Sequence, residues 1–293
     1  KKTEFMEFAQ GKIDFMNSID SSFRDQLLEN TGALKKKYSQ TINLLTGPYL
    51  NTEYIGFNMG NKNSPVNSKK IRLAINYGFD RVKMIKYLRN NIGYPANRGF
   101  IPLGLDKNIN TVGFDYQPNK ARRLVEEYKK ENKNKSIELE LSTDANYVDI
   151  VEFIQKEVSE IGINIKINIM PPSSLRQAKS NGKLEMFRAS WIADYPDAEN
   201  YLSLFYSKNK APDGPNYTHF KNENYDKNYI KTYLEQSPIL RNKIYSLLDQ
   251  MIIEEAPIVP FYYDKVMRFS KKNVFGLKTN PVNQLNLKKV YKK

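Results

Sequence analysis

The sequence of 293 residues contains no cysteine and a single histidine, His219. Without cysteine there is no disulfide, no thiolate metal site and no cysteine nucleophile. One histidine leaves a serine–histidine triad a single candidate base, and it excludes a multi-histidine metal site within this chain. These absences disfavour hydrolytic chemistry. They leave the redox compartment open, because a large core needs no disulfides.

Long apolar runs are also absent. No run of about 18 apolar residues occurs, so the sequence predicts no transmembrane helix. The opening segment, KKTEFMEFAQGKIDFM, lacks the apolar core of a secretory signal. Because it begins without Met and enters an apolar-periodic pattern at once, we expect the chain to be a piece of a longer protein.

Acidic residues are in short supply: 46 Lys and Arg stand against 32 Asp and Glu, which gives a formal net charge of +14. An excess of positive charge is a feature of nucleic-acid-binding proteins. The basic residues are scattered here, however, with only short clusters at 35–37 and at the C-terminal end, and no nucleic-acid motif accompanies them. We therefore expect a solvated basic surface and no nucleic-acid partner.

Apolar residues at spacings of three and four predict helices in two blocks. Within 68–91 the expected buried stripe is Ile71, Ile75, Phe79, Val82, Ile85 and Leu88. Two short helices joined near Gly78 fit this block, with Ser68 and Asp80 as candidate N-caps. In the second block, QPNKARRLVEEYKK, Pro118 suits a first helical turn. The expected stripe of this block is Ala121, Leu124, Val125 and Tyr128.

Residues 136–170 carry the clearest pattern, which is a strand, a helix and a second strand. Alternation predicts the first strand at Ile137, Leu139 and Leu141 and the second at Ile163, Ile165, Ile167 and Ile169. The helical stripe between them is Ile150, Ile154, Val158 and Ile161. Gly162 can end this helix in a left-handed conformation. Such a crossover unit should be right-handed, with parallel strands.

The only tryptophan, Trp191, ends the next predicted strand. A short helix and an Asn-Gly turn within 171–191 lead into this strand. The stretch RASWIADYPDAENYLSLFYSKN, residues 188–209, therefore starts at the carboxyl end of a strand in an α/β sheet. Ligands of such sheets tend to bind at that edge.

Three carboxylates follow Trp191, and they admit two interpretations. In the first, DYPDAENYLSLF is a helix start, with Pro196 in the first turn and Asp197 and Glu199 at the positive end of the helix dipole. In the second, Asp194 is an anion on the loop after the strand, aimed at a cationic ligand group. The helix start accounts for Asp197 and Glu199 and only partly for Asp194, so composition leaves both interpretations open.

Seven blocks of the sequence resemble, in their order, a known family. They are FMEFAQGKIDFMNSID, IRLAINYGFDR, GFIPLGL, KARRLVEEY, FRASWIADYPDAENYLSLFYSKN, NYTHFKNENYD and APIVPFYYDKVMRFSKKNVFGLKTNP. This series is similar to that of the oligopeptide- and dipeptide-binding proteins of bacterial ABC importers, the extracellular solute-binding proteins of family 5. The resemblance covers essentially the whole chain. It implies a C-terminal portion, since members of this family carry a further N-terminal half.

The resemblance implies an α/β fold of the periplasmic-binding-protein type II: one lobe with a mixed sheet flanked by helices, plus partial segments of the other lobe. Residues 1–50 would be a partial segment of lobe I and 51–261 the C-terminal ligand-binding lobe II. Residues 262–293 would return to lobe I. The fragment alone is then expected to fold around lobe II and to bind peptide weakly.

The resemblance also implies ligand-binding residues. In the family's peptide binders the Asp of a W-x-A-D-Y motif holds the α-ammonium group of the ligand, and the matching residue is Asp194. Arg188 could meet the ligand carboxylate in some members. Ser190 and Ile192 could pair their backbone groups with an extended peptide.

The aromatic residues and the histidine keep two interpretations each. Trp191 and Tyr195 could stack on the ligand or fill the inner surface of the lobe. His219 could be proposed as a metal ligand, and we prefer a loop residue satisfied by its neighbours. No catalytic residue, metal or cofactor is expected.

The function implied by the resemblance is that of the substrate-binding component of an ABC transporter. Such a protein captures oligopeptides or dipeptides by clamshell closure and presents them to a membrane permease. We expect it to be a monomer, and we expect no enzymatic activity. The expected location is periplasmic or extracytoplasmic, as a lipoprotein whose membrane anchor is not in this fragment. One alternative is a non-peptide cargo of the same family: nickel, haem or an oligosaccharide. The other is a glycoside hydrolase using Asp194, Asp197 and Glu199, whose carboxylates would lie ~5–9.5 Å apart.

Overall fold

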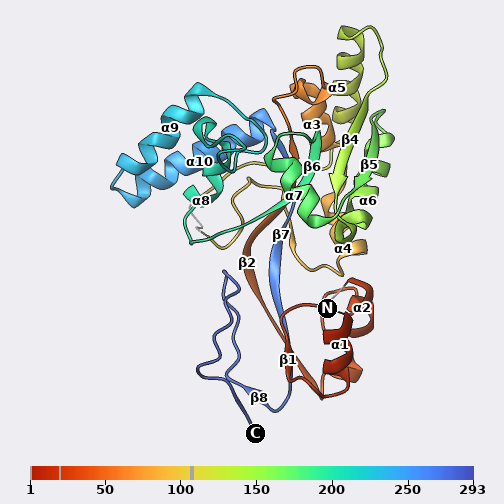
Figure 1. The fold of residues 1–293 in the computed structure, drawn as a ribbon, viewed down its shortest axis with the longest axis vertical. Helices are drawn as coiled ribbons and strands as arrows, with labels where there is room; N and C mark the ends of the chain where they lie inside the picture. Colours follow the sequence, from red (N-terminus) through yellow and green to blue (C-terminus); the bar gives the residue numbers. More distant parts are fainter. Residues whose placement is uncertain (1, 20, 106–108) are drawn as a thin grey trace.

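The computed structural model describes residues 2–19, 21–105 and 109–293 (Figure 1). In these residues a seven-stranded sheet has the order β1-β7-β2-β6-β4-β5, with β3 beside β7. Its strands are β1 (Phe15–Met16), β2 (Ile42–Phe57), β3 (Tyr94–Pro95), β4 (Glu138–Thr143), β5 (Asn164–Ile169), β6 (Met186–Ile192) and β7 (Ile258–Lys271). β4 is parallel to β5 and β6, whereas β2 is antiparallel to β6 and β7, so the sheet is mixed.

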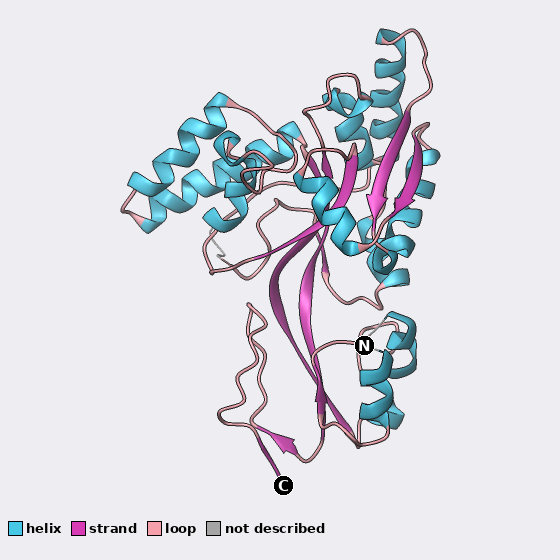
Figure 2. Cartoon of the chain, in the orientation of Figure 1, coloured by secondary structure: helices cyan, strands magenta, loops and turns pink. Residues whose placement is uncertain are grey.

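Helices lie on both sides of the sheet (Figure 2). One core contains α3 (Lys69–Tyr77), α4 (Arg81–Leu88), α5 (Pro118–Glu131) and α6 (Val148–Ser159). The core on the opposite face contains α7 (Pro172–Ser180), α8 (Glu199–Leu202), α9 (Glu223–Leu234) and α10 (Pro238–Glu255). Single 3-10 turns are Lys36–Tyr38, Pro65–Asn67, Ala145–Tyr147, Ser203–Phe205 and Ser207–Asn209. The predicted mixed sheet flanked by helices is confirmed.

The strands β2 and β7 are much longer than the others, with 16 and 14 residues. They run side by side beyond the helical layers to a smaller part that holds α1 (Lys2–Ala9), α2 (Ser21–Leu27), β1 and the pair β8 (Val274–Phe275) and β9 (Tyr291–Lys292) (Figure 1). The β2–β7 register shifts between Pro48 and Thr52 and again between Glu53 and Tyr54. Such irregularities bend a strand and increase its twist, so the ribbon changes direction between the two parts.

The predicted crossover unit is confirmed as β4, α6 and a parallel β5. Leu139 lies opposite Ile165 and Leu141 opposite Ile167 in the parallel register. Gly162 follows α6 with φ 88°, the left-handed conformation expected of it. The handedness of the crossover stays a prediction.

The two short helices joined near Gly78 are confirmed as α3 and α4. Asp80 caps α4, because its side chain accepts a hydrogen bond from the third helical backbone N–H at 3.0 Å. Ser68 occupies the N-cap position of α3, but its side chain makes no capping hydrogen bond. In α5 the predicted stripe faces the core, with Ala121 and Val125 buried.

Two residues predicted to be buried are exposed: Val82 by 59% and Ile169 by 56%. At Val82 the helical count fails because the chain turns between α3 and α4. The second helix buries Arg81, Met84 and Ile85 instead. Ile169 is the last residue of β5, which is the edge strand of the sheet, so fewer neighbours cover it. In the described part of the chain, no helix combines the length and the apolar character needed to span a bilayer.

Candidate functional site

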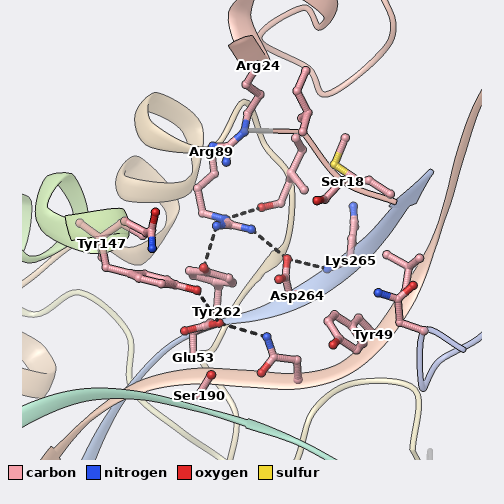
Figure 3. A pocket seen from close by; sticks show the side chains of 18 of the residues that line it. Ser18, Arg24, Tyr49, Glu53, Arg89, Tyr147, Ser190, Tyr262, Asp264 and Lys265 are labelled. Carbon is pink, nitrogen blue, oxygen red and sulfur yellow. Dashed lines mark hydrogen bonds and ion pairs between the residues drawn. The ribbon is translucent and has the colours of Figure 1, made fainter. Parts of the chain in front are cut away.

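A cavity of ≈ 510 Å³ lies beside the irregular stretch of β2 and β7 (Figure 3). Segments far apart in the sequence form its wall: the loop 17–19 with α2, the end of α4, the start of α6, and the strands β2, β6 and β7. Ser190 and Ile192 contribute to the wall from β6. The volume falls in the range of small-molecule pockets, roughly 300–1,000 Å³.

Glu53 lines this cavity and forms a buried ion pair with Arg188. The two residues are diagonal neighbours across antiparallel strands, because Glu53 of β2 lies opposite Ser190 of β6. The Arg188 guanidinium also lies 3.7 Å from Asp144 Oδ2 and 3.2 Å from the ring centroid of Tyr147. Burial alone would lower the pKa of Arg188, but the Glu53 carboxylate and the Tyr147 hydroxyl raise it. The charge of Arg188 is therefore satisfied inside the protein.

A second ion pair joins Arg89 and Asp264 on the same wall. Arg89 Nη2 donates to Asp264 Oδ1 at 2.8 Å, and Arg89 Nη1 donates to the Tyr262 hydroxyl at 2.6 Å. Burial raises the pKa of Tyr262 well above its usual value, so this hydroxyl stays neutral. Figure 3 shows this network as one wall of the cavity.

The loop after β6 is fixed by a buried amide. Asn200 is 4% exposed, and its Oδ1 accepts hydrogen bonds from Trp191 Nε1 at 2.8 Å and from the backbone N–H of Asp194 at 3.4 Å. These bonds tie the tryptophan ring to the turn that carries Asp194. The Asp194 carboxylate itself is exposed and makes no hydrogen bond or ion pair with any residue that the structure describes.

The other two carboxylates of this segment bind tyrosines. Asp197 Oδ1 accepts from the Tyr245 hydroxyl at 2.7 Å and from the backbone N–H of Glu199 at 2.9 Å. Glu199, the first residue of α8, accepts from the hydroxyls of Tyr195, Tyr229 and Tyr233. Burial and the bond to Glu199 raise the pKa of Tyr195 to about 12. Asp197 and Glu199 thus lie at the start of α8, as the first interpretation predicts. Pro196, however, lies before the helix rather than in its first turn, because α8 begins only at Glu199.

Residues 1–213 match the family described as bacterial extracellular solute-binding proteins, family 5 Middle. The chain belongs to this family. It is 26% identical over 98% of its length to the dipeptide-binding protein DppE of Bacillus subtilis, and it covers 52% of that protein. It is 25% identical over 81% of its length to the glutathione-binding protein GsiB of Escherichia coli K12, and it covers 47% of that protein. The chain thus spans about half the length of the curated relatives it matches.

Solved structures of peptide-binding proteins share the fold of this family 5 chain. The DppA protein of Helicobacter pylori in complex with the peptide STSA has a TM-score of 0.84 at 24% identity, covering 99% of this chain and 55% of that protein. The oligopeptide-binding protein AppA of Bacillus subtilis in complex with a nonapeptide has a TM-score of 0.80 at 23% identity. The match covers 100% of this chain and 58% of AppA. The predicted periplasmic-binding-protein-like fold is confirmed.

The structure separates the predicted ligand residues into three groups. Ser190 and Ile192 line the cavity. Arg188 lies behind it in the ion pair with Glu53, and Trp191 packs partly buried against the helical core. The two remaining predicted ligand residues, Asp194 and Tyr195, are exposed on the loop beyond β6. Their roles toward a ligand stay predictions for this family 5 chain.

Sequence reasoning missed most of the cavity wall. Arg24, Asn51, Glu53, Arg89 and Lys265 line it. No local motif marks them, because each belongs to an otherwise ordinary helix, loop or strand.

His219 lies in a loop with φ 53°, and its ring occupies the space that a side chain at Gly60 or Gly182 would need. Its Nε2 is buried without a hydrogen-bond partner among the described residues, so the expectation of a loop histidine satisfied by its neighbours is wrong for this atom. Burial and the nearby Lys210 lower the pKa of His219. Among the described residues no group of three histidine or carboxylate side chains is placed to hold a metal. The glycoside hydrolase alternative finds no support either, since the family and the named relatives are binding proteins.

Proposed function

We propose that this family 5 chain is part of the substrate-binding component of an ABC importer and that its cargo is a peptide. The observation that carries the proposal is the placement of Asp194. The carboxylate is exposed and has no partner among the described residues, and it follows two residues after Ile192, which lines the cavity together with Ser190. A peptide lying along β6 would then present its ammonium group to Asp194 and its backbone to the strand.

We further propose that residues 51–261 form lobe II and that 1–50 and 262–293 belong to lobe I. The strands β2 and β7 cross both boundaries without a break. The register shift between Pro48 and Thr52 falls at the first boundary, and the cavity opens beside it. A hinge at this shift would let the two lobes close on a ligand.

The proposed setting of the protein follows from its relatives. The relatives are named as dipeptide-, glutathione- and oligopeptide-binding proteins, and the two solved structures, DppA and AppA, each hold a peptide. The family is described as extracellular. We therefore propose an extracytoplasmic, membrane-anchored monomer that delivers its peptide to a membrane permease.

Replacement of Asp194 by Asn tests the peptide proposal. Loss of one partner from a charge pair that the bound peptide buries typically costs ~2–5 kcal/mol, which corresponds to at least about a 30-fold weaker affinity. We expect Asp194→Asn to lose saturable binding of trialanine in a calorimetric or NMR titration. Asp213→Asn, which removes an exposed carboxylate on another loop, is the matched control and should bind as the parent does.

N-acetyltrialanine sharpens this test because it lacks the ammonium group. The parent chain should bind the acetylated peptide as weakly as Asp194→Asn binds the free peptide. Asp194→Asn should not lower the affinity for the acetylated peptide any further. Equal affinity of the parent and of Asp194→Asn for free trialanine would refute the role of Asp194.

A further inference from the structure

The hairpin of α9 and α10 ends in a turn that lies far from the sheet. Residues 235–237 form this turn, and Figure 1 shows it at the outer end of the two helices. The inner faces of both helices are buried in the core, through Tyr225 and Tyr229 of α9 and through Tyr245 and Leu248 of α10. The core therefore fixes the hairpin while its outer end projects from the molecule.

Apolar side chains gather at this outer end and face solvent. Leu234 is 75% exposed and Ile239 is 72% exposed, one on each side of the turn. Ile230 and Tyr233 share the outer face of α9 with Leu234, because they precede it by one helical turn or less, and all are exposed. Leu240 adds a fifth exposed side chain on α10. The outer face of a solvated helix is usually polar, so this apolar tip (Ile230, Tyr233, Leu234, Ile239 and Leu240) marks an interaction surface.

The ring of Tyr233 is held in place within the apolar tip. Its hydroxyl donates to Glu199 Oε1 at 2.7 Å, and its ring meets that of Tyr229 edge to face, with centroids 5.6 Å apart. The polar end of the side chain is thus bound to the protein while the ring stays open to solvent. Rings of this amphipathic kind are enriched where a protein meets the headgroups of a bilayer.

Cations stand about one turn behind the apolar tip on both helices. Lys231 precedes Leu234 by three residues and Lys243 follows Ile239 by four, which are axial distances of ~4.5 Å and ~6 Å. Both lysines are exposed, and neither forms an ion pair with a residue that the structure describes. Lys231 donates only to the side-chain oxygen of Asn228, at 3.3 Å. Their charges are therefore open to an anion outside the protein.

The other charged groups of this end leave it positive. Glu235 is the one acid of residues 227–243, and its Oε1 accepts from the backbone N–H of Ser237 at 2.8 Å. Four cations lie in the same stretch, including Arg241, whose Nη2 is 3.8 Å from Asp197 Oδ2. Even with Arg241 offset by Asp197, the lysines outweigh Glu235, so the surface is complementary to an anionic partner.

The order of these features matches the surface of a bilayer. The apolar side chains of an interfacial helix enter ~5–10 Å into the boundary of headgroups and acyl chains, while Lys and Arg keep their charges at the headgroups. A second copy of this chain fits the tip less well. Five side chains on a projecting end offer less than the ~800 Å² per partner of a stable interface, and two like-charged tips would repel each other.

We propose that the end of the α9–α10 hairpin is a membrane-contact site that takes an anionic phospholipid surface. Leu234 and Ile239 enter the apolar boundary, and the Tyr233 ring lies among the headgroups. Lys231 and Lys243 pair with lipid phosphates, each raising the affinity about fivefold. Neither the cavity nor its cargo takes part, so the site does not depend on the proposed function. A contact of this size is reversible and orients a protein that is already near a membrane.

Flotation of the full chain with lipid vesicles tests the site. One set of vesicles contains equal parts of phosphatidylglycerol and phosphatidylcholine, and the other contains phosphatidylcholine alone. We expect binding to the anionic set and at least about fivefold weaker binding to the neutral set. Leu234→Ser combined with Ile239→Ser should weaken binding to the anionic vesicles at least about fivefold, and so should Lys231→Gln combined with Lys243→Gln.

Matched controls separate the tip from the general positive charge of the chain. Val82→Ser combined with Tyr87→Ser removes two exposed apolar side chains of α4, and Lys130→Gln combined with Lys135→Gln removes two exposed lysines at and beyond the end of α5. Both control pairs should bind the anionic vesicles as the parent does. Equal weakening by the control pairs and the tip pairs would overturn the site, because net charge and scattered apolar residues would then explain the binding.

Leu234→Trp reports insertion itself. Its emission should be quenched by phosphatidylcholine with brominated acyl chains, mixed with phosphatidylglycerol, whereas Trp191 of the parent packs against the helical core and should not be quenched. Binding without this quenching would overturn insertion of the tip.

Two further outcomes keep the proposal open to refutation. Glu235→Gln should strengthen binding to the anionic vesicles, a gain that misfolding does not predict, and unchanged or weaker binding would contradict the assigned charge pattern. A dimer without lipid in sedimentation velocity, dissociated by Leu234→Ser combined with Ile239→Ser, would assign the tip to a second copy and overturn the membrane site.

Discussion

Asp249 is a buried carboxylate of α10 that holds the buried residues Phe100 and Thr111 against this helix. It is 1% exposed, and its oxygens accept from the backbone N–H of Phe100 at 2.7 Å and from the Thr111 hydroxyl at 2.8 Å. Burial raises the pKa of Asp249 to about 6, although these hydrogen bonds act in the opposite direction. The stability that this one residue contributes should therefore depend on pH.

The folded state should hold the Asp249 proton more tightly than the unfolded chain does. Its contribution to the free energy of unfolding is then complete below about pH 4 and decreases as the pH rises through about 6, by roughly 3 kcal/mol. Asp249→Asn removes this titration and keeps one acceptor. We expect the stability difference between Asp249→Asn and the parent to shift in favour of the variant from pH 4 to pH 7, measured by urea unfolding.

A stability difference that is the same at pH 4 and pH 7 would contradict this assignment. Asp213→Asn serves as the control, because its carboxylate is exposed and should leave the pH dependence unchanged. The comparison isolates one group, since both variants remove one aspartate.

At the scale of an element, β2 is the strand on which the architecture depends. It pairs with β6 on one side and with β7 on the other, and its residues alternate between the two helical cores. Ile55 and Phe57 face one core, and Tyr54 faces the other. At Gly56 the ring of Phe187 occupies the space that a side chain would need. The missing side chain therefore lets β6 and β2 remain paired over a full aromatic ring.

Gly56→Ala should place a methyl group against the Phe187 ring. Overpacking of a buried site typically costs 1–3 kcal/mol, and we expect a loss of about this size in urea unfolding. Phe187→Leu reduces the crowding, so the double variant should lose less stability than the sum of the two single variants. If the stability losses of Gly56→Ala and Phe187→Leu simply add, the Phe187 ring is not what excludes a side chain at position 56.

At the scale of the whole molecule, the chain spans about half the length of its curated relatives. Binding proteins that close on a ligand divide its contacts between two lobes. If a full site binds at about 1 μM, or −8.2 kcal/mol, half of that free energy corresponds to a dissociation constant of about 1 mM. We therefore expect this chain alone to bind trialanine in the millimolar range in an NMR titration. Micromolar binding would show instead that the residues of this chain alone supply the full binding free energy.

Local sequence signals determined much of the fold. The stripes of α5 and α6, the alternation of β4 and β5, the cap at Asp80 and the left-handed Gly162 depend on neighbours within a turn or a strand, so their spacing was sufficient. The same holds for Asp197 and Glu199 at the start of α8. The predicted burial of Val82 was wrong, because the helical spacing was continued across the turn between α3 and α4, where the helical period is interrupted.

The tertiary structure alone decided the cavity. The ion pair of Glu53 and Arg188 joins residues 135 positions apart, and the wall continues from Asn17 to Asn283. Each contact depends on strand order and register, which place distant segments side by side and which no short window of sequence encodes. The W-x-A-D-Y motif could therefore direct attention to Asp194, whereas Arg24 and Lys265 became neighbours of one space only when β2 and β7 brought both ends of the chain together.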